Sequence, residues 1–208
     1  MQENAIEIPL FGQQKKTYKN GDMYEGGFVN GKREGKGVYI FSNGDKYEGD
    51  FKQGMKDGEG KYTYSNGNIY EGTWKNDEKC GNGTYYYLSH SDLEELRHRD
   101  IKEVCNIYKG IFVNGKFEGN GVVSYRNGDT FEGTFHDDKK EGIGVYKFAD
   151  GKIFKGNFSR DNFEGEGTMF YPDKSRMTGI YRSSTPIGVH VKTFPDEKVE
   201  EIDFGEYN

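Results

Sequence analysis

The sequence has few of the residues that build an ordinary globular core. Only 32% of its 208 residues are hydrophobic, and it contains four prolines, two cysteines and one tryptophan. The aliphatic residues among them are too few for a thick core between two packed layers. Apolar runs are short as well, and none approaches the roughly 20 residues that a helix needs to cross a bilayer. We therefore expect a soluble chain with a thin core.

The scarce cysteines and the acidic charge balance exclude further classes of protein. Cys80 and Cys105 show no CxxC spacing, which fits a reduced, cytoplasmic compartment. The formal net charge of -6 argues against general nucleic-acid binding, because such binding needs a basic surface. The N-terminal residues MQENAIEIPLFG lack the charged start and apolar run of a secretory signal. We expect a cytoplasmic protein that does not bind nucleic acid.

Residues suited to catalysis are present but scattered. The histidines show no metal-ligand spacing to the cysteines. Gly31 to Gly37 resembles a phosphate-binding loop, but its spacing is one residue short and it lacks Ser or Thr. No Ser/His/Asp or paired-carboxylate arrangement stands out, since each candidate acid recurs at a repeated position. The sequence predicts no enzymatic activity, no cofactor and no metal site.

The abundant residues are 31 glycines, 16 tyrosines and 15 phenylalanines, and they fall in a repeat. The stretch Tyr24 to Lys46, YEGGFVNGKREGKGVYIFSNGDK, returns with a period of 23 residues, which 15 extra residues break once. A fixed period of this length indicates an array in which each unit contacts only its neighbours. Further units begin at Tyr47, Tyr70, Tyr108, Phe131, Phe154 and, more weakly, Met177.

Each unit is predicted to be a β-hairpin. Tyr24, Gly26 and Phe28 alternate with Glu25 and Gly27, the two-residue period of a strand. An Asn-Gly pair between the two predicted strands supplies the positive φ angles of a tight turn. Successive hairpins should join into an all-β fold, an elongated, twisted, single-layer antiparallel meander.

The paired glycines of each unit, such as Gly58 and Gly60, lie just before ring-bearing positions. Glycine in a strand costs roughly 0.5–1 kcal/mol relative to alanine, so we expect an aromatic ring to lie over the bare backbone. The rings should form two ladders. The first contains Tyr24, Tyr47, Tyr70, Tyr108, Phe131 and Phe154, and the second contains Phe28, Phe51, Trp74, Phe112, Phe135 and Phe158.

The interruption at about residues 88–107 has a different pattern. Ser91 and Glu94 form a capping-box pair. Near-helical spacing of apolar residues predicts an amphipathic α-helix over 91–105, inserted at one edge of the sheet. Two interpretations remain open: the helix packs back on its own sheet, or it is a docking helix for a partner. Its apolar residues include Leu93, Leu96, Ile101 and Val104.

The repeats divide the chain into three parts. Residues 1–23 form a lead-in and a half repeat, and residues 24–176 contain six full repeats with the helical insertion. Residues 177–208 form a degenerate capping repeat and an acidic tail, as expected at the end of an array.

The core YEGxF/W-x-x-G-K-x-x-G-x-G, followed by NG, resembles the MORN (membrane occupation and recognition nexus) repeat. The stretch from Tyr24 to Gly37 matches it position by position, and the resemblance covers about residues 17–190 outside the inserted helix. Lys109 and Lys155 depart from it where the family has Glu, and Asn76-Asp77 stands where Gly is usual. The resemblance implies a twisted β-meander with a shallow aromatic groove. It also implies a scaffold or adaptor in a cytoskeletal, ciliary (axonemal) or cortical assembly in the cytoplasm.

Two alternative binding surfaces are predicted, the first for a partner protein and the second for a membrane. In the first, a partner helix or peptide lies along the two ring ladders. Glu25, Glu48 and Glu71 form an acidic row beside the rings, interrupted later by Lys109 and Lys155. The alternative for this row is simple pairing with cross-strand lysines on a solvated sheet.

The second surface is a basic edge that binds anionic phospholipid. Acids in the same hairpin loops would weaken this attraction, which is worth about 1 kcal/mol per basic residue. Self-association through the remaining face of the sheet is a further expectation. The predicted lipid edge consists of Lys32, Arg33, Lys56, Lys79, Lys116, Lys139 and Lys140.

Overall fold

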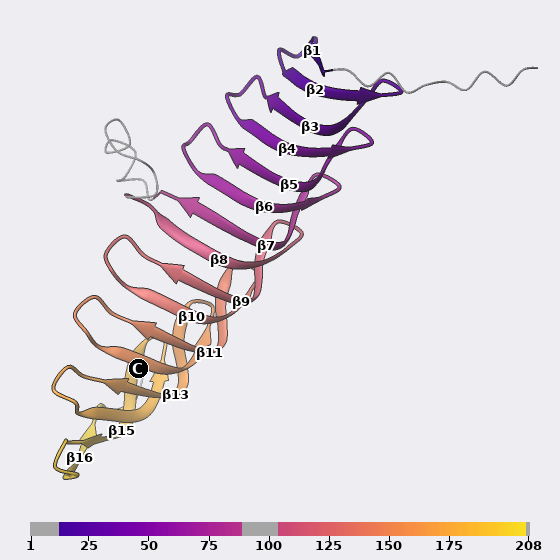
Figure 1. Ribbon diagram of the computed structural model, residues 1–208. Coiled ribbons are helices and arrows are strands. Elements are labelled where there is room, and N and C mark those ends of the chain that lie inside the picture. The colour runs from indigo at the N-terminus through magenta and orange to yellow at the C-terminus, as the bar shows by residue number, and fades with distance from the viewer. Residues whose placement is uncertain (1–12, 89–103, 207–208) are drawn as a thin grey trace, which may run out of the picture.

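The computed structural model describes residues 13–88 and 104–206. In these ranges the chain forms one open sheet of 16 antiparallel strands, in which each strand pairs with its neighbours in sequence. Figure 1 shows the strands side by side along a long, twisted array that runs from β1 to β16. The predicted all-β meander is confirmed. The strands are β1 Gln13–Thr17, β2 Met23–Val29, β3 Lys32–Ile40, β4 Lys46–Lys52, β5 Met55–Thr63, β6 Ile69–Lys75, β7 Glu78–Tyr87, β8 Asn106–Val113, β9 Lys116–Ser124, β10 Thr130–His136, β11 Lys139–Lys147, β12 Ile153–Ser159, β13 Asn162–Phe170, β14 Arg176–Arg182, β15 Thr185–Thr193 and β16 Val199–Asp203.

The inserted segment does not interrupt the sheet. β7 and β8 lie on either side of it and pair directly, from Gly81 opposite Phe112 to Tyr87 opposite Asn106. The predicted helix over 91–105 lies outside the described residues except for its end. The elements in the described ranges are all strands, so the helix is not shown there.

The hairpin turns use the predicted backbone conformation. Asn30 and Gly31 both have positive φ, at 50° and 73°. The equivalent turn after β10 reaches the same conformation with Asp137 and Asp138, at 53° and 69°. Because Asn and Asp tolerate the left-handed region better than other side chains, the turn survives the loss of its glycine.

The two glycines of each pair have different roles. A Cβ on Gly37 would lie 2.5 Å from the Tyr24 hydroxyl oxygen, because the tyrosine ring lies over this backbone. Gly35 has open space around it but a φ of 71°, next to the register shift between Gly26 and Phe28. The predicted ring over bare backbone is therefore confirmed for the second glycine, whereas the first shapes a β-bulge.

Both predicted ladders form the core. Tyr24 is 0% exposed and Phe28 is 7% exposed, and their equivalents along the sheet are similarly buried. Ring centroids of Tyr24 and Phe51 lie 5.1 Å apart at 81°, so Tyr24 meets the aromatic ring of the next repeat edge to face, and Tyr47 meets Trp74 in the same way. A one-layer sheet obtains its core from rings packed on one of its own faces, hereafter the ring face.

Candidate functional site: the ring face

A further row of rings covers the edge of the two ladders. Tyr39 donates a hydrogen bond to Asp22 Oδ2 at 2.6 Å, and Tyr62 donates one to Asp45 Oδ2 at 2.7 Å. These aspartates close the turn before the hairpin and also accept backbone N–H groups, such as Ser42 N–H at 2.8 Å. The hydrogen bond from Tyr39 is the main cause that lowers the pKa of Asp22 below its ordinary value. Tyr39 and Tyr62 are thus each anchored to a carboxylate.

The rings that a partner could touch differ from those predicted. The two ladders, from Tyr24 to Phe158, are nearly inaccessible and form the floor of the ring face. Sequence reasoning placed them at the interface because it could not tell the floor of a groove from its surface. The partly buried rings packed on this floor include Tyr18, Phe41, Tyr64, Tyr85, Tyr87, Phe117, Tyr125, Tyr146, Phe148 and Phe163.

Four cations lie over these rings at equivalent repeat positions: Arg33, Lys56, Lys79 and Lys140. Lys56 Nζ lies 4.2 Å from the Trp74 ring centroid, and Lys79 Nζ lies 5.0 Å from that of Tyr85. Such contacts are favourable because the face of an aromatic ring is electron-rich. The predicted lipid edge contained all four, but the structure places them on the ring face.

The first and last of these four cations, Arg33 and Lys140, have polar partners. Arg33 donates hydrogen bonds from Nε, at 3.0 Å, and from its terminal nitrogen to the Gly54 carbonyl. Lys140 Nζ donates to the Tyr125 hydroxyl at 2.9 Å and lies 3.5 Å from Asp161 Oδ1.

The inner two, Lys56 and Lys79, lack such partners. Within residues 13–88 and 104–206, neither ammonium has a hydrogen-bond acceptor or a carboxylate within salt-bridge distance. Burial among the rings lowers the pKa of both lysines. The carboxylates of Asp77 and Asp138 oppose this lowering from beyond salt-bridge distance, so both lysines are partly desolvated cations whose direct side-chain contacts are with rings.

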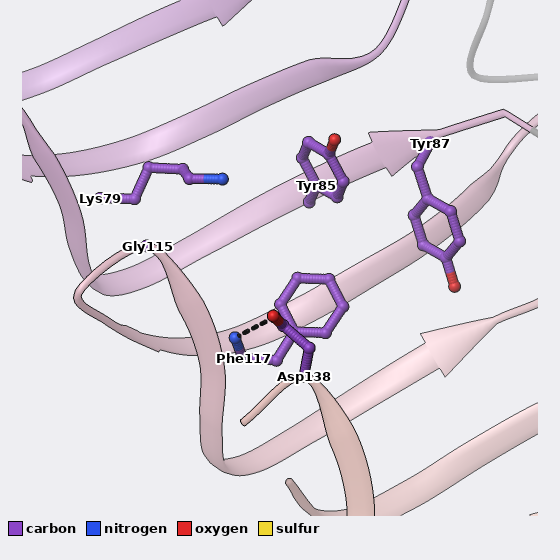
Figure 2. A pocket seen from close by; sticks show the side chains of 6 residues that line it. All are labelled: Lys79, Tyr85, Tyr87, Gly115, Phe117 and Asp138. Atoms are coloured by element: carbon purple, nitrogen blue, oxygen red, sulfur yellow. Dashed lines mark hydrogen bonds between the residues drawn. The ribbon is translucent and has the colours of Figure 1, made fainter. Parts of the chain in front are cut away.

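Each inner cation stands at a hollow in the ring face. The hollow at Lys79 has a volume of about 410 Å³. Figure 2 shows its rings with Asp138, which accepts the Phe117 N–H at 2.8 Å. A second hollow of about 240 Å³ contains Lys56 and Arg33. Both combine aromatic walls with one carboxylate, and the first contains one cation whereas the second contains two. The first is lined by Lys79, Tyr85, Tyr87, Gly115, Phe117 and Asp138, and the second by Arg33, Tyr39, Phe41, Tyr47, Phe51, Lys56 and Asp77.

The predicted acidic row lies on the opposite face of the sheet. Tyr24 and Glu25 are adjacent in a strand, so their side chains point to opposite faces. Glu71 lies 3.4 Å from Lys61, its cross-strand neighbour, and Glu48 lies 2.9 Å from Lys46. The geometry fits the alternative of pairing with lysines, and the row does not flank the rings. Lys109 also lies on this opposite face, in a shallow depression with Glu59 and Glu71.

The remaining lysines of the predicted lipid edge lie at the hairpin turns. Lys32 Nζ donates to Gln53 Oε1 at 3.2 Å, Lys116 pairs with Asp137, and Lys139 is exposed. Acids of the same turns are engaged by backbone groups: Glu34 accepts the Gln53 N–H of the next hairpin at 2.9 Å. Whether this edge binds lipid stays a prediction.

The predicted docking helix also remains untested. Leu93, Leu96 and Ile101 lie outside the described residues, and Val104 is fully buried. Cys105 beside it packs against Ile69 and Tyr86.

Within residues 13–88 and 104–206, no helix is long and apolar enough to cross a membrane, and no cluster of three metal-ligating side chains occurs.

The 23-residue hairpins, their ring ladders and the paired glycines define a class of single-layer repeat protein. The MORN repeat family matches residues 24–46, 47–69, 70–91, 108–130, 131–153 and 154–176. These segments make up more than half of the chain, and the protein belongs to the MORN repeat family.

Matches among solved structures are distant. The TCP domain of Drosophila melanogaster SAS-4 (dCPAP), in complex with a proline-rich motif of Ana2 (dSTIL), is 15% identical with a TM-score of 0.47, covering 91% of this chain and 88% of that one. The wild-type TCP10 domain of Danio rerio CPAP is 15% identical with a TM-score of 0.28, covering 91% and 94%. No curated protein matches the sequence.

Proposed function

We propose that this protein is a non-enzymatic scaffold that binds a segment of a partner protein along the ring face. Acidic side chains of that segment would pair with Lys56 and Lys79. The observation that carries the proposal is the position of these two lysines, which are partly desolvated, lie at hollows, and form no salt bridge in the described part of the chain.

The energetics favour an anionic ligand there. Burying a cation without a salt bridge or hydrogen-bond acceptor costs free energy, and contact with rings and the more distant Asp77 and Asp138 offsets only part of this cost, since the net pKa of both lysines is lowered. A carboxylate entering a hollow would meet a cation in surroundings less polar than water, where their attraction is stronger. The tyrosines around each hollow add the kind of ring surface that anchors protein interfaces.

Repeat geometry restricts the spacing of the acids in the partner. Lys56 and Lys79 occupy equivalent positions on β5 and β7, two strands apart, or roughly 9.5 Å along the array. An extended peptide rises about 3.3 Å per residue, so acids three residues apart would reach both lysines. A helix rises about 1.5 Å per residue and would need acids six or seven residues apart.

The cellular setting is also part of the proposal. A cytoplasmic location in a cytoskeletal assembly, at an axoneme or at the cell cortex, is supported by the resemblance of the repeats to scaffold members of the family.

The proposal can be tested by cross-linking mass spectrometry on the protein purified gently from its native source. We expect one partner protein to cross-link reproducibly near the ring face of the native protein. The double variant Lys56→Ala/Lys79→Ala should no longer recover this partner. The matched control is Lys46→Ala/Lys61→Ala, whose lysines pair with glutamates on the opposite face. Equal recovery with both double variants would refute binding at the ring face.

A second measurement uses the only tryptophan. Lys56 lies over Trp74, so a peptide bound at Lys56 should change the fluorescence of this ring. Synthetic peptides with acids three or seven residues apart, taken from the cross-linked partner, would separate the extended mode from the helical one. Flotation with phosphatidylserine vesicles that depends on Lys32, Lys116 and Lys139 would instead support the lipid edge.

A further inference from the structure

The sheet ends in two open edges of opposite charge. In the part of the chain that the structure describes, β1 pairs only with β2, and β16 pairs only with β15. The edge strand β1 has the sequence QQKKT, with Lys15 and Lys16, whereas β16 has the sequence VEEID, with Glu200 and Glu201. Each edge leaves backbone N–H and C=O groups available for another strand.

The two edge strands are complementary halves of one repeat. Lys16 lies 23 residues before Tyr39, so β1 corresponds to β3, the second strand of a hairpin. Glu200 lies 23 residues after Met177, so β16 corresponds to β14, the first strand of a hairpin. The first strand of the sheet, β1, is therefore the second half of a hairpin, and the last strand, β16, is the first half of one. A strand equivalent to β1 would complete the hairpin that β16 begins.

We propose that the protein associates head to tail. In this junction β16 of one copy pairs antiparallel with β1 of the next, in the register that joins the two strands of a hairpin. In the hairpin of β2 and β3, Tyr24 is opposite Tyr39 and Glu25 is opposite Val38. The same register places Glu200 opposite Lys16 of the next copy and Glu201 opposite Lys15. Both charged pairs across the junction are then of opposite sign, on the two faces of the sheet.

Charge selects this junction over the others. Opposite charges facing each other across a strand pair are favourable, and like charges are unfavourable. Two β1 edges would bring lysines together, and two β16 edges would bring glutamates together. Because the contact joins unlike edges, it does not close into a twofold dimer but continues into a chain of copies.

Apolar exposure at the end of the sheet supports an open edge at β16. Phe204 occupies the repeat position of Phe28 and Phe158, yet it is 42% exposed, whereas those two rings are 7% and 1% exposed. In the interior, Phe158 is flanked by Phe163 of the following strand at 5.3 Å. Val199 at the start of β16 is 68% exposed. A strand beside β16 would cover apolar surface that the interior repeats bury.

The first experiment is sedimentation velocity at increasing concentration of the full chain. We expect species larger than a monomer, and association weaker by about tenfold or more in Glu200→Lys/Glu201→Lys and in Lys15→Glu/Lys16→Glu. An equimolar mixture of the two variants restores an opposite-charge junction at every contact and should associate again. The matched control is Lys36→Glu/Glu48→Lys, which alters exposed charges away from both edges. A wild-type protein that stays monomeric, or a mixture that does not recover, overturns the proposal.

A disulfide trap reports the register directly. Thr17 and Val199 are opposite each other in the proposed junction but lie at opposite ends of one molecule, 15 strand spacings or roughly 70 Å apart. Under mild oxidation, Thr17→Cys/Val199→Cys should give a ladder of linked copies on a non-reducing gel. Each single variant and the native chain, with its own Cys80 and Cys105, serve as controls. A ladder no stronger than in these controls contradicts the register.

Discussion

The ring of His190 lies over Gly179 and replaces, from the opposite strand, the tyrosine ring of earlier repeats. A Cβ on Gly179 would come within 2.3 Å of His190 Cδ2. In the first repeat, Tyr24 covers the glycines and donates to the Gly27 carbonyl at 3.1 Å. In the last repeat Met177 occupies the tyrosine position, and His190 Nε2 lies 2.9 Å from the equivalent carbonyl, that of Ile180. The ring over the backbone and its hydrogen bond are both retained. In the last repeat the second strand, β15, supplies the ring, whereas in the first repeat the first strand, β2, supplies it.

This exchange predicts a compensating pair of substitutions. His190→Gly should destabilise β14 and β15 by about 2–4 kcal/mol, because it removes a fully buried ring. Adding Met177→Tyr to His190→Gly should recover most of this loss, since it restores the arrangement of the other repeats. Hydrogen exchange of the β14 and β15 amides measures the effect locally. Met177→Tyr alone is the control, and it should destabilise because two rings then compete for the space over Gly179.

A second prediction concerns Gly60 beneath Tyr47. An alanine Cβ there would lie 2.3 Å from the Tyr47 hydroxyl oxygen and 2.4 Å from its Cε2, so Gly60→Ala should cost about 1–3 kcal/mol or more. Tyr47→Ala/Gly60→Ala should cost less than the sum of the single variants, because the clash disappears with the ring. Urea unfolding of the four proteins gives this coupling. Additive costs would mean that the ring does not restrict this glycine.

Asp22 should make stability depend on acid pH. Its pKa is lowered mainly by the hydrogen bond from Tyr39, so its contribution is complete above the ordinary value of 3.8 and disappears as pH falls through the lower folded value. Asp22→Asn should therefore be less stable than the native protein near neutral pH, and the difference should shrink below about pH 3.8. Asn68 occupies the equivalent position naturally and donates to the Tyr85 oxygen, so the variant should fold. A difference that stays constant with pH would contradict this role.

The cations of the ring face should differ in their effect on stability. Lys56→Met removes a partly desolvated charge and keeps the length of the side chain, so the free energy of unfolding should stay within about 1 kcal/mol of the native value. Arg33→Met should cost about 1.5–3 kcal/mol, because Arg33 donates charged hydrogen bonds to Gly54. Thermal unfolding of both variants gives the comparison. A large loss in Lys56→Met would show that this lysine holds the fold together and is not a free ligand-binding group.

The sequence by itself determined the hairpin array and its core. The 23-residue period, the alternation of Tyr24 with Glu25 and the Asn-Gly turns specify strands, faces and turns, because each depends only on neighbours within one repeat. The ring over Gly37 could be predicted for the same reason, since a strand glycine needs a contact to offset its cost.

The tertiary structure decided which side chains are accessible. Arg33 and Lys56 follow turn glycines and look like loop residues in the sequence, yet they belong to the ring face, as their even spacing from Tyr39 and Tyr62 could have indicated. The burial of Tyr24 depends on Phe51 of the next repeat, and the partners of Lys79 depend on how neighbouring hairpins twist past one another. The burial of a side chain and the pairing of its charge depend on residues of several neighbouring strands, so the sequence of one repeat does not determine them.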